Sequence, residues 1–396
     1  MGMRITALSL LLSLLLRRRL PKAIAALVSI ALCIARAQGP AVNGLSLTTR
    51  DRIDDAGWWP TKGDAPRSQY VGVEACKGCH NSIAIPQETT PMNRAAVRVA
   101  ESEILKSLGQ STFHQPGFSY SLVRAPQGVI FSASDGTNES VAQAVWGFGA
   151  GEYGQTYILE KNGAYTEGRL SYFTRMHALD ITPGQASKTP HGVDEALGKK
   201  LDPETARLCF GCHTTGAVTA KKLDSERAIP GVTCEACHGP GASHVSAMRE
   251  KDDENGPATI LNPKRLSPAD SVDFCGACHR TWADVTMEMP TNMGAALVRF
   301  QPFRLEQSKC WGKSGDVRIT CMACHDPHQP LVHQLSAYDR KCLACHSGLP
   351  DSKAHVAIKT CKVGTSDCAS CHMPKVEVPE AHATFTDHYI RVVRPK

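Results

Sequence analysis

Apolar and polar positions alternate through the middle of the chain, from about residue 118 to residue 173. The alternating stretches are rich in β-branched and aromatic residues, and Asp135-Gly136 and Asn162-Gly163 separate them. This pattern is typical of strands joined by tight turns in a small antiparallel sheet. The predicted strands are Phe118–Val123, Gly128–Ser132, Val141–Phe148, Gln155–Leu159 and Tyr165–Phe173.

Helical spacing of apolar residues occurs on either side of this region. Pro91–Leu108 precedes it, and short helices are predicted at Glu204–Phe210 and Ala269–Arg280, with Pro and Gly between the segments. Residues 38–70 are rich in Pro, Gly and charge, and they predict a loosely ordered leader.

The cysteines change this picture, because fourteen of the 17 lie in seven copies of one pattern, Cys-x-x-Cys-His. This pattern is the attachment signature of c-type haem: two thiols on one helical turn bind one porphyrin, and the histidine binds its iron. In chain order, motifs 1 to 7 are Cys76/Cys79/His80, Cys209/Cys212/His213, Cys234/Cys237/His238, Cys275/Cys278/His279, Cys321/Cys324/His325, Cys342/Cys345/His346 and Cys368/Cys371/His372.

Zinc sites and a disulfide scaffold are the alternatives to haem. Zinc sites made of Cys-x-x-Cys pairs need two pairs per metal and have no use for a histidine after every second cysteine. A disulfide framework would not repeat one triplet seven times. The sequence therefore predicts seven covalently attached haems c, each with iron.

The amino terminus predicts export. Residues 1–37 carry six basic residues and no acidic one, and an apolar stretch, Ala23 to Ile34, precedes Ala35-Arg36-Ala37. This layout predicts a secretory signal peptide cleaved after Ala37, and hence a periplasmic or outer-surface location. An uncleaved anchor is less favoured, because the apolar stretch is short for a bilayer.

The charge balance follows from this leader. The chain has 44 basic and 38 acidic residues, and six of the basic ones lie within residues 1–37, so the mature chain would be formally neutral. The basic excess therefore gives no support for nucleic-acid binding. No nucleotide-phosphate motif is present either.

The spacing of the motifs predicts the organisation of the chain. A long gap follows motif 1, whereas the last six motifs follow one another closely from Cys209. With so little polypeptide per haem, we expect a mainly α protein with little regular structure, a core of stacked haems, and a small antiparallel β insertion between motifs 1 and 2. The expected divisions are 1–37 signal peptide, 38–70 leader, 71–117 first haem segment, 118–190 β-rich insertion and 191–396 six-haem domain.

Distal ligands separate an electron carrier from a catalyst. Nine histidines lie outside the motifs, enough to give all seven irons a second histidine. His244 and His328 follow their own motif histidines too closely to reach the opposite face of the same iron, so we expect each to serve a neighbouring haem. The favoured distal ligands are His244, His328 and His388, then His114, His355 and His382; His177, His191 and His333 are less favoured, and Met92 is an alternative for the first iron.

Cys310 and Cys361 are the two cysteines of the mature chain outside the motifs. In an oxidising compartment, two spare thiols most simply form a disulfide. A free thiol or a thiolate ligand to iron is the alternative.

Several phrases resemble a superfamily of multihaem cytochromes that includes the tetrahaem electron acceptor of hydroxylamine oxidoreductase and pentahaem nitrite reductase. They are Tyr70–Cys76, Gly231–His244, Cys321–His328, Cys368–Lys375, Trp146–Gly151 and Phe385–His388. The resemblance implies a mostly helical haem domain with paired haems, and His244 and His328 as distal ligands. The Cys-x-x-Cys-Lys site of the nitrite reductases is absent, so their catalytic roles are not carried over.

Three functions are consistent with these features. We favour electron transfer between redox partner proteins or membrane quinol-linked donors. The second is a reductase or oxidoreductase of a small nitrogen or sulfur compound at one open iron, most simply that of motif 1. The third is a subunit of a conducting polymer. Residues of the β-rich insertion that would line the open site are Tyr153, Tyr157, Arg169, Tyr172, Arg175 and His177.

Overall fold

The computed structural model describes residues 48–54, 65–219, 222–290, 292–308, 310–311, 319–346, 361 and 363–393, all within the unit Ser46–Lys396. The expected signal peptide and His355 lie outside these residues. Among the helices that the structure describes, none is both long and apolar enough to cross a membrane.

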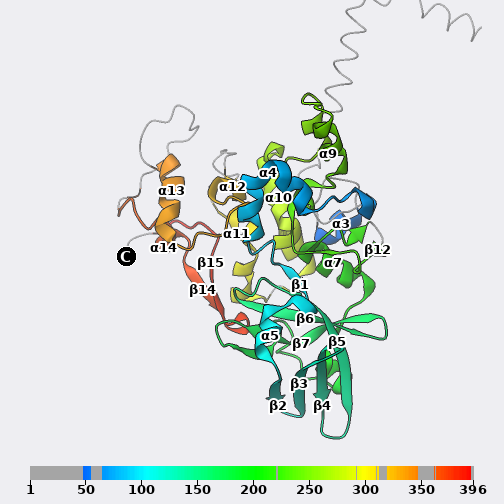
Figure 1. The fold of residues 1–396 in the computed structure, drawn as a ribbon. Coiled ribbons are helices and arrows are strands. Elements are labelled where there is room, and N and C mark those ends of the chain that lie inside the picture. The colour runs from blue at the N-terminus through cyan, green and yellow to red at the C-terminus, as the bar shows by residue number, and fades with distance from the viewer. Residues whose placement is uncertain are drawn as a thin grey trace, which may run out of the picture. The chain divides into compact units, whose positions relative to one another are not determined.

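A nine-stranded antiparallel sheet extends from Ala96 to Lys200 (Figure 1). Its main strand order is β2-β3-β4-β5-β6-β7-β8, with β1 paired to β5 and β9 paired to β7. The strands are β1 (Ala96–Arg98), β2 (Ser111–Gln115), β3 (Phe118–Ala125), β4 (Gly128–Ser134), β5 (Glu139–Phe148), β6 (Gly154–Lys161), β7 (Ala164–Phe173), β8 (Ala178–Ile181) and β9 (Gly198–Lys200).

The sheet curls into a nearly closed barrel, in which the end strands β2 and β8 are in contact. Arg169 of β7 supports this closure: its Nε donates to Gln115 Oε1 of β2 at 3.2 Å, and its other nitrogens donate to the carbonyls of Gln185 and Lys188. Closure protects the free edges of a sheet. The prediction of a mainly α fold with a small β insertion is therefore wrong.

The five predicted strands correspond to β3 to β7, and the error lies in the shorter strands around them. β1, β8 and β9 have only three or four residues, too few to show a clear alternation. The stretch Pro91–Leu108, predicted as one helix, instead contains β1, the 3-10 turn η2 (Val99–Glu101) and the short helix α5 (Glu103–Leu108). At the β6–β7 turn, Asn162 and Gly163 have φ of 53° and 73°, as the Asn-Gly signal predicts.

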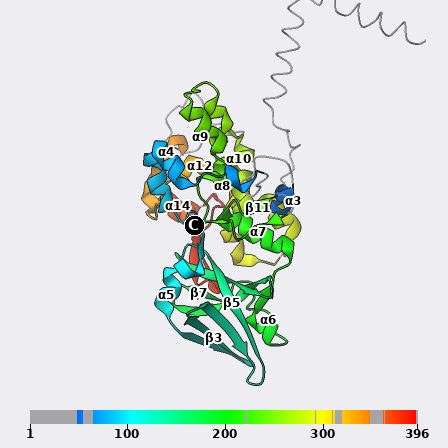
Figure 2. The ribbon, with the colours of Figure 1, turned by 45° about the vertical axis from the view of Figure 1, so that its right-hand side comes forward.

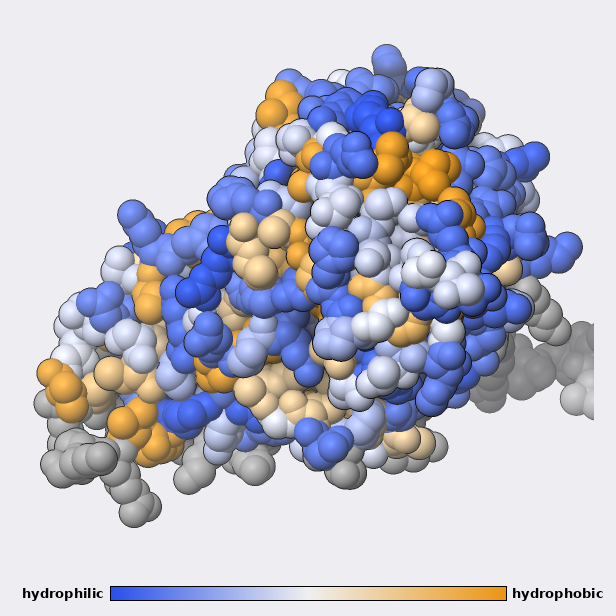
Figure 3. All heavy atoms as spheres, turned by 90° about the horizontal axis from the view of Figure 1, so that it is seen from below, coloured by the Kyte–Doolittle hydropathy of each residue, from blue (hydrophilic) through white to orange (hydrophobic). Residues whose placement is uncertain are grey.

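Apolar side chains fill the barrel. Leu122, Tyr157 and Leu159 are fully buried, and they pack with residues from β3 to β8, α5 and α6 (Val193–Leu197). The expectation that haems alone form the core therefore fails for this part of the chain. Seen from the barrel side, the surface is mostly polar, with apolar side chains in scattered groups (Figure 3).

Short helices carry the seven motifs; most of them lie away from the barrel, whereas the helix of motif 2 adjoins it (Figures 1 and 2). The predicted helices at Glu204–Phe210 and Ala269–Arg280 correspond to α7 and α10, which Asp202 and Ser267 cap. The helices are α3 (Thr49–Asp54), α4 (Val73–Glu88), α7 (Pro203–His213), α8 (Cys234–His238), α9 (Ala242–Arg249), α10 (Pro268–His279), α11 (Gln301–Glu306), α12 (Cys321–Cys324), α13 (Asp339–His346) and α14 (Cys368–His372).

Small elements complete the fold. The two-stranded antiparallel sheets are β10 (Thr214–Thr215) with β13 (Ile229–Pro230), β11 (Val218–Thr219) with β12 (Lys222–Leu223), and β14 (Lys375–Val378) with β15 (Ala383–Thr386). The short 3-10 and π helices are η1 (Arg67–Gln69), η3 (Gly256–Thr259), η4 (Pro263–Arg265), the π-helical η5 (Asp284–Glu288), η6 (Gly294–Arg299), η7 (Leu335–Tyr338) and η8 (Pro379–Ala381).

Part of the expected leader is ordered against the motif-bearing helices. In α3, the backbone N–H of Thr49 donates to Asp284 Oδ1 at 2.6 Å, and its hydroxyl donates to Asp284 Oδ2 at 2.8 Å. Both residues are buried. This contact fixes the start of α3 beside α10 and η5.

Candidate haem sites

Each of the seven motifs lies on or at the end of a helix. Six of the histidines are the last residue of a helix or stand directly after it, and His80 lies at a kink inside α4. One helical turn brings the two thiols of a motif to the same side, as attachment to one porphyrin requires. Local structure therefore suits haem attachment at every motif.

The motifs form a row whose order differs from the order along the chain. Motif 1 adjoins motif 3, which adjoins motif 4, and the row continues through motifs 5, 6 and 7. Motif 2 branches from motif 4. The neighbouring cysteines are Cys76 and Cys234, Cys237 and Cys275, Cys212 and Cys278, Cys275 and Cys321, Cys324 and Cys342, and Cys342 and Cys368.

Three motif histidines face a second histidine at a separation that suits a shared iron. When two imidazoles bind opposite sides of one metal, the distance between their ring centroids is the sum of two metal–nitrogen bonds, each about 2 Å long, and the distance from each bound nitrogen to its own ring centroid. The observed separations match this sum. The pairs are His80 with His244 (6.4 Å between ring centroids, 18° between planes), His238 with His328 (6.1 Å, 11°) and His325 with His388 (6.2 Å, 38°).

Backbone carbonyls hold several of these rings through Nδ1. A bond at Nδ1 fixes the tautomer and orientation of the ring and leaves Nε2 for a metal. These contacts are His213 with Ala95 O (3.0 Å), His238 with Leu261 O (2.8 Å), His244 with Gly256 O (3.0 Å), His372 with Arg391 O (2.7 Å) and His388 with Thr386 O (3.0 Å). The donor set therefore fits haem iron.

Burial favours the neutral, metal-binding form of five histidines, namely His213, His238, His279, His325 and His388. It lowers the pKa of His388 to about 4, helped by the nearby His325. Burial also lowers the pKa of His213, His238, His279 and His325.

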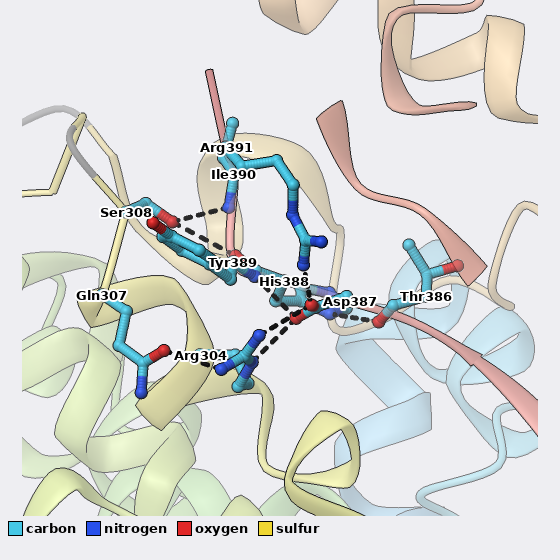
Figure 4. Close-up of polar contacts among 9 residues, drawn as sticks. All are labelled: Arg304, Gln307, Ser308, Thr386, Asp387, His388, Tyr389, Ile390 and Arg391. Atoms are coloured by element: carbon cyan, nitrogen blue, oxygen red, sulfur yellow. Dashed lines mark hydrogen bonds and ion pairs between the residues drawn. The ribbon is translucent and has the colours of Figure 1, made fainter. Parts of the chain in front are cut away.

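A buried carboxylate supports the segment that carries His388 (Figure 4). Asp387 accepts two hydrogen bonds from Arg304, at 2.8 and 2.7 Å, and is also paired with Arg391. Although burial alone would raise the pKa of Asp387, the bonds from Arg304 and the backbone of Tyr389 hold it below its usual value. Because the carbonyl of Arg391 also contacts His372, this segment links motif 5 to motif 7.

The other candidate histidines lie elsewhere. His114 is exposed on β2, and its Nδ1 lies 3.2 Å from Ser119 Oγ. His382 Nε2 lies 2.8 Å from Asp180 Oδ2, so that carboxylate occupies the nitrogen that would face a metal. His355 lies outside the described residues. His177 and His191 are exposed at the surface of the barrel region, and His333 is exposed before η7.

The barrel adjoins motif 2 rather than motif 1. Phe148 of β5 stacks on His213 at 4.7 Å between centroids, with 3° between the rings, and Phe210 of motif 2 packs against Trp146 and Phe148. Motif 1 instead adjoins motif 3. The long gap after motif 1 in the sequence had indicated an isolated site. In space, motif 1 is not isolated.

The residues expected to line an open site beside motif 1 have other surroundings. Tyr157 and Arg169 are buried in the barrel. Tyr153 contacts Phe385, Arg175 pairs with Glu377, and Tyr172 contacts His177. In the described chain, these side chains do not converge beside Cys76, Cys79 and His80.

Cys310 and Cys361 are not joined to each other. Cys310 is half-buried within electrostatic reach of Cys342 and Cys345, whereas Cys361 is exposed.

Two carboxylates were missed by the sequence reasoning, Asp387 and Glu235. Each stands beside candidate haem-binding residues, Asp387 directly before His388 and Glu235 inside motif 3. The sequence signal that could have revealed both was an acidic residue at a position where haem attachment does not require one.

Comparisons with known proteins agree with the motifs. The family model described as cytochrome c554 and c-prime matches residues 170–239, which contain motifs 2 and 3. The chain is 23% identical over 220 residues to the multiheme cytochrome MtrA of Shewanella baltica, covering 51% of this chain and 55% of the relative. It is 23% identical over 190 residues to the dissimilatory sulfite reductase MccA of Wolinella succinogenes, covering 39% and 24%.

The chain thus spans about half or less of the length of these relatives. Among solved structures, the outer cell wall cytochrome OcwA is similar with a TM-score of 0.44 and 17% identity, over 82% of this chain and 80% of that one. The motifs and the sequence matches identify the chain as a multihaem c-type cytochrome. Within that class, its sequence is similar to MtrA and, over two motifs, to the cytochrome c554 family.

Proposed function

We propose that this chain is an exported heptahaem cytochrome that transfers electrons between redox partner proteins, or from membrane quinol-linked donors, through mostly bis-histidine haems. The three histidine pairs carry this proposal, because their separations suit one iron each. The continuous contact between neighbouring motifs supports transfer along the row.

The chain's own residues position and enclose the cofactor. When bound, haem c supplies a one-electron iron couple. The motif cysteines would attach it, His80, His238 and His325 would bind on one side, and the second histidine of each pair would bind on the other. Carbonyls at Nδ1 orient the rings. We propose that the remaining motifs bind haem through His213, His279, His346 and His372.

Mass spectrometry of the purified mature protein tests the cofactor count and export together. We expect a chain that begins at Gln38, carries seven haem additions, and is recovered from the periplasmic or surface fraction. A mass with fewer additions contradicts the heptahaem proposal. A chain that still begins at Met1 contradicts cleavage after Ala37.

Electron paramagnetic resonance tests the ligation. In the oxidised protein, we expect low-spin signals from the irons of motifs 1, 3 and 5. Changing His244, His328 or His388 to Ala should convert one haem each to the high-spin form. If none of the three substitutions changes the spectrum, the pairing is wrong. A reduced protein should pass its electrons to a soluble ferric acceptor without turning over nitrite or sulfite.

A second candidate function is a reductase with an open iron. One observation favours it: one similar sequence is that of a dissimilatory sulfite reductase. A high-spin ferric signal in the unmodified protein, together with turnover of nitrite or sulfite by the dye-reduced enzyme, would establish this function in place of simple transfer.

A further inference from the structure

Glu235 is a buried carboxylate inside motif 3, with 3% of its surface exposed. Its two oxygens accept three backbone hydrogen bonds. Oε1 accepts from Val71 N at 2.9 Å and from Gly241 N at 2.8 Å, and Oε2 accepts from Gly72 N at 2.9 Å. Bonds to an ionised acceptor are stronger than bonds between neutral groups.

Haem attachment does not explain an acid at this position. The residue directly after the first motif cysteine differs in every motif, and only motif 3 has an acidic one. In chain order these residues are Lys77, Phe210, Glu235, Gly276, Met322, Leu343 and Ala369. The role of Glu235 is therefore to be found in its contacts.

Glu235 belongs to motif 3, but these contacts connect the starts of two helices whose histidines are assigned to the site of motif 1. Val71 and Gly72 stand immediately before α4, which carries His80, and Gly241 is the N-cap of α9, which carries His244. Both helices therefore begin at hydrogen bonds to one carboxylate. The junction is tight, since a Cβ at Gly241 would lie 2.9 Å from Val71 Cγ2 and 3.2 Å from Glu235 Oε1.

We propose that Glu235 is a positioning residue for the iron of motif 1: it sets the starts of α4 and α9 so that His80 and His244 face each other across one metal. This inference rests on the ligation proposed above for His80 and His244. Their ring centroids lie 6.4 Å apart, and a small shift of either helix would lengthen that distance beyond two coordination bonds. A residue of motif 3 thus completes the site of motif 1.

The side chain is matched to this role by charge and length. Gln has one acceptor oxygen in place of two, and its amide nitrogen would face a backbone N–H. Ala would leave all three N–H groups without an acceptor. Both changes should loosen α9 relative to α4 while keeping the cysteines that attach haem.

The test compares E235Q and E235A with H244A and E250A in the full mature protein. Glu250 follows α9 directly and is exposed, and its contact is with Ser246, so E250A is a matched control for loss of an acid. Mass spectrometry measures haem content, and electron paramagnetic resonance with visible spectra measures spin state. Imidazole is then added to each variant.

We expect E235Q and E235A to keep seven haems and to convert one of the seven to the high-spin form, as H244A does. E250A should stay unchanged. Imidazole should return the converted haem to low spin, because it can occupy the freed position of the iron. E235Q is close to isosteric, and it keeps the test open if E235A is unstable.

Two results overturn the inference in distinguishable ways. If H244A gives a high-spin haem and E235Q does not, Glu235 does not position the ligands, while the proposed ligation stands. If H244A leaves every haem low-spin, the proposed ligation itself is wrong. Loss of a haem from E235Q would assign Glu235 to attachment at motif 3 and would also overturn its positioning role.

Discussion

The barrel and the motif-bearing helices are held together by different means. Strands of seven to ten residues form the central ladder of the barrel, and side chains such as Leu122 and Leu159 fill its interior. The motif-bearing region has helices as short as four residues and two small apolar clusters of its own. Its larger cluster, around Phe210, is shared with the barrel through Trp146 and Phe148. Polar contacts fix its histidines instead, through backbone carbonyls, Glu235 and Asp387.

This difference indicates where folding depends on the cofactor. A helix of four or five residues is not stable alone, because nucleation costs more than its few hydrogen bonds return. α8, α12 and α14 are of this kind. The barrel, by contrast, has an apolar interior of its own, and we expect it to form without haem.

Production of the chain without haem attachment should separate the two regions most strongly. We expect the amides of β3 to β7 to stay protected in hydrogen exchange, and those of α8, α12 and α14 to exchange as fast as an unfolded chain. Mass spectrometry of peptides measures both regions in one sample. Full exchange of β5 and β6 would contradict an independently folded barrel.

Asp387→Ala should cause the largest loss of stability from one substitution in the motif-bearing region. Asp387 has 2% of its side chain exposed and pairs with Arg304. Removing one partner of such a buried pair costs about 3–5 kcal/mol. We expect lower thermal stability and a high-spin signal from motif 5. Glu377→Ala breaks an exposed pair with Arg175 and should cost no more than about 1 kcal/mol.

Leu159→Ala should weaken the barrel without changing the haem spectrum. Leu159 is fully buried, and a Leu→Ala change in a core costs about 2–5 kcal/mol. Denaturant unfolding followed by far-ultraviolet circular dichroism measures the loss. Val141→Ala, at an exposed position of β5, is the control and should change stability by less than about 0.5 kcal/mol. A changed spin state in Leu159→Ala would show that the regions are coupled.

Gly163→Ala should have the smallest effect, confined to the β6–β7 turn. Gly163 has φ of +73°, and a side chain there meets nothing within 4 Å, so the cost is the left-handed backbone alone, roughly 1–2 kcal/mol. Gly192→Ala is the control, because that glycine also has free space but an extended backbone. Equal losses of stability in the two variants would contradict this explanation.

The sequence predicts attachment chemistry better than architecture. Cys-x-x-Cys-His is a local pattern, so all seven motifs could be located from residue order. The strands β3 to β7 were predicted because their alternation is long. Closure of the barrel could not be predicted, since it depends on contacts such as Arg169 with Gln115, which are far apart in the chain. The spatial order of the motifs could not be predicted either, because it also depends on contacts between residues that are far apart in the chain.

The ligand candidates show the same limit. His244, His328 and His388 were favoured, and the structure brings each to face a motif histidine. His382 was given even odds, but its position beside Asp180 depends on the docking of the β14–β15 hairpin against the barrel. Spacing along the chain carries no information about such docking.

The branch at motif 4 gives the row three ends where a simple line has two. Cys79 of motif 1 and Cys371 of motif 7 are exposed, whereas the end at motif 2 is covered by Phe148 and the barrel. With haem at every motif, as proposed, the molecule would be a branched electron path with two exposed ends and one end covered by the barrel. Transfer between the exposed ends would not pass through motif 2, so the barrel could set the potential of that haem without interrupting the path.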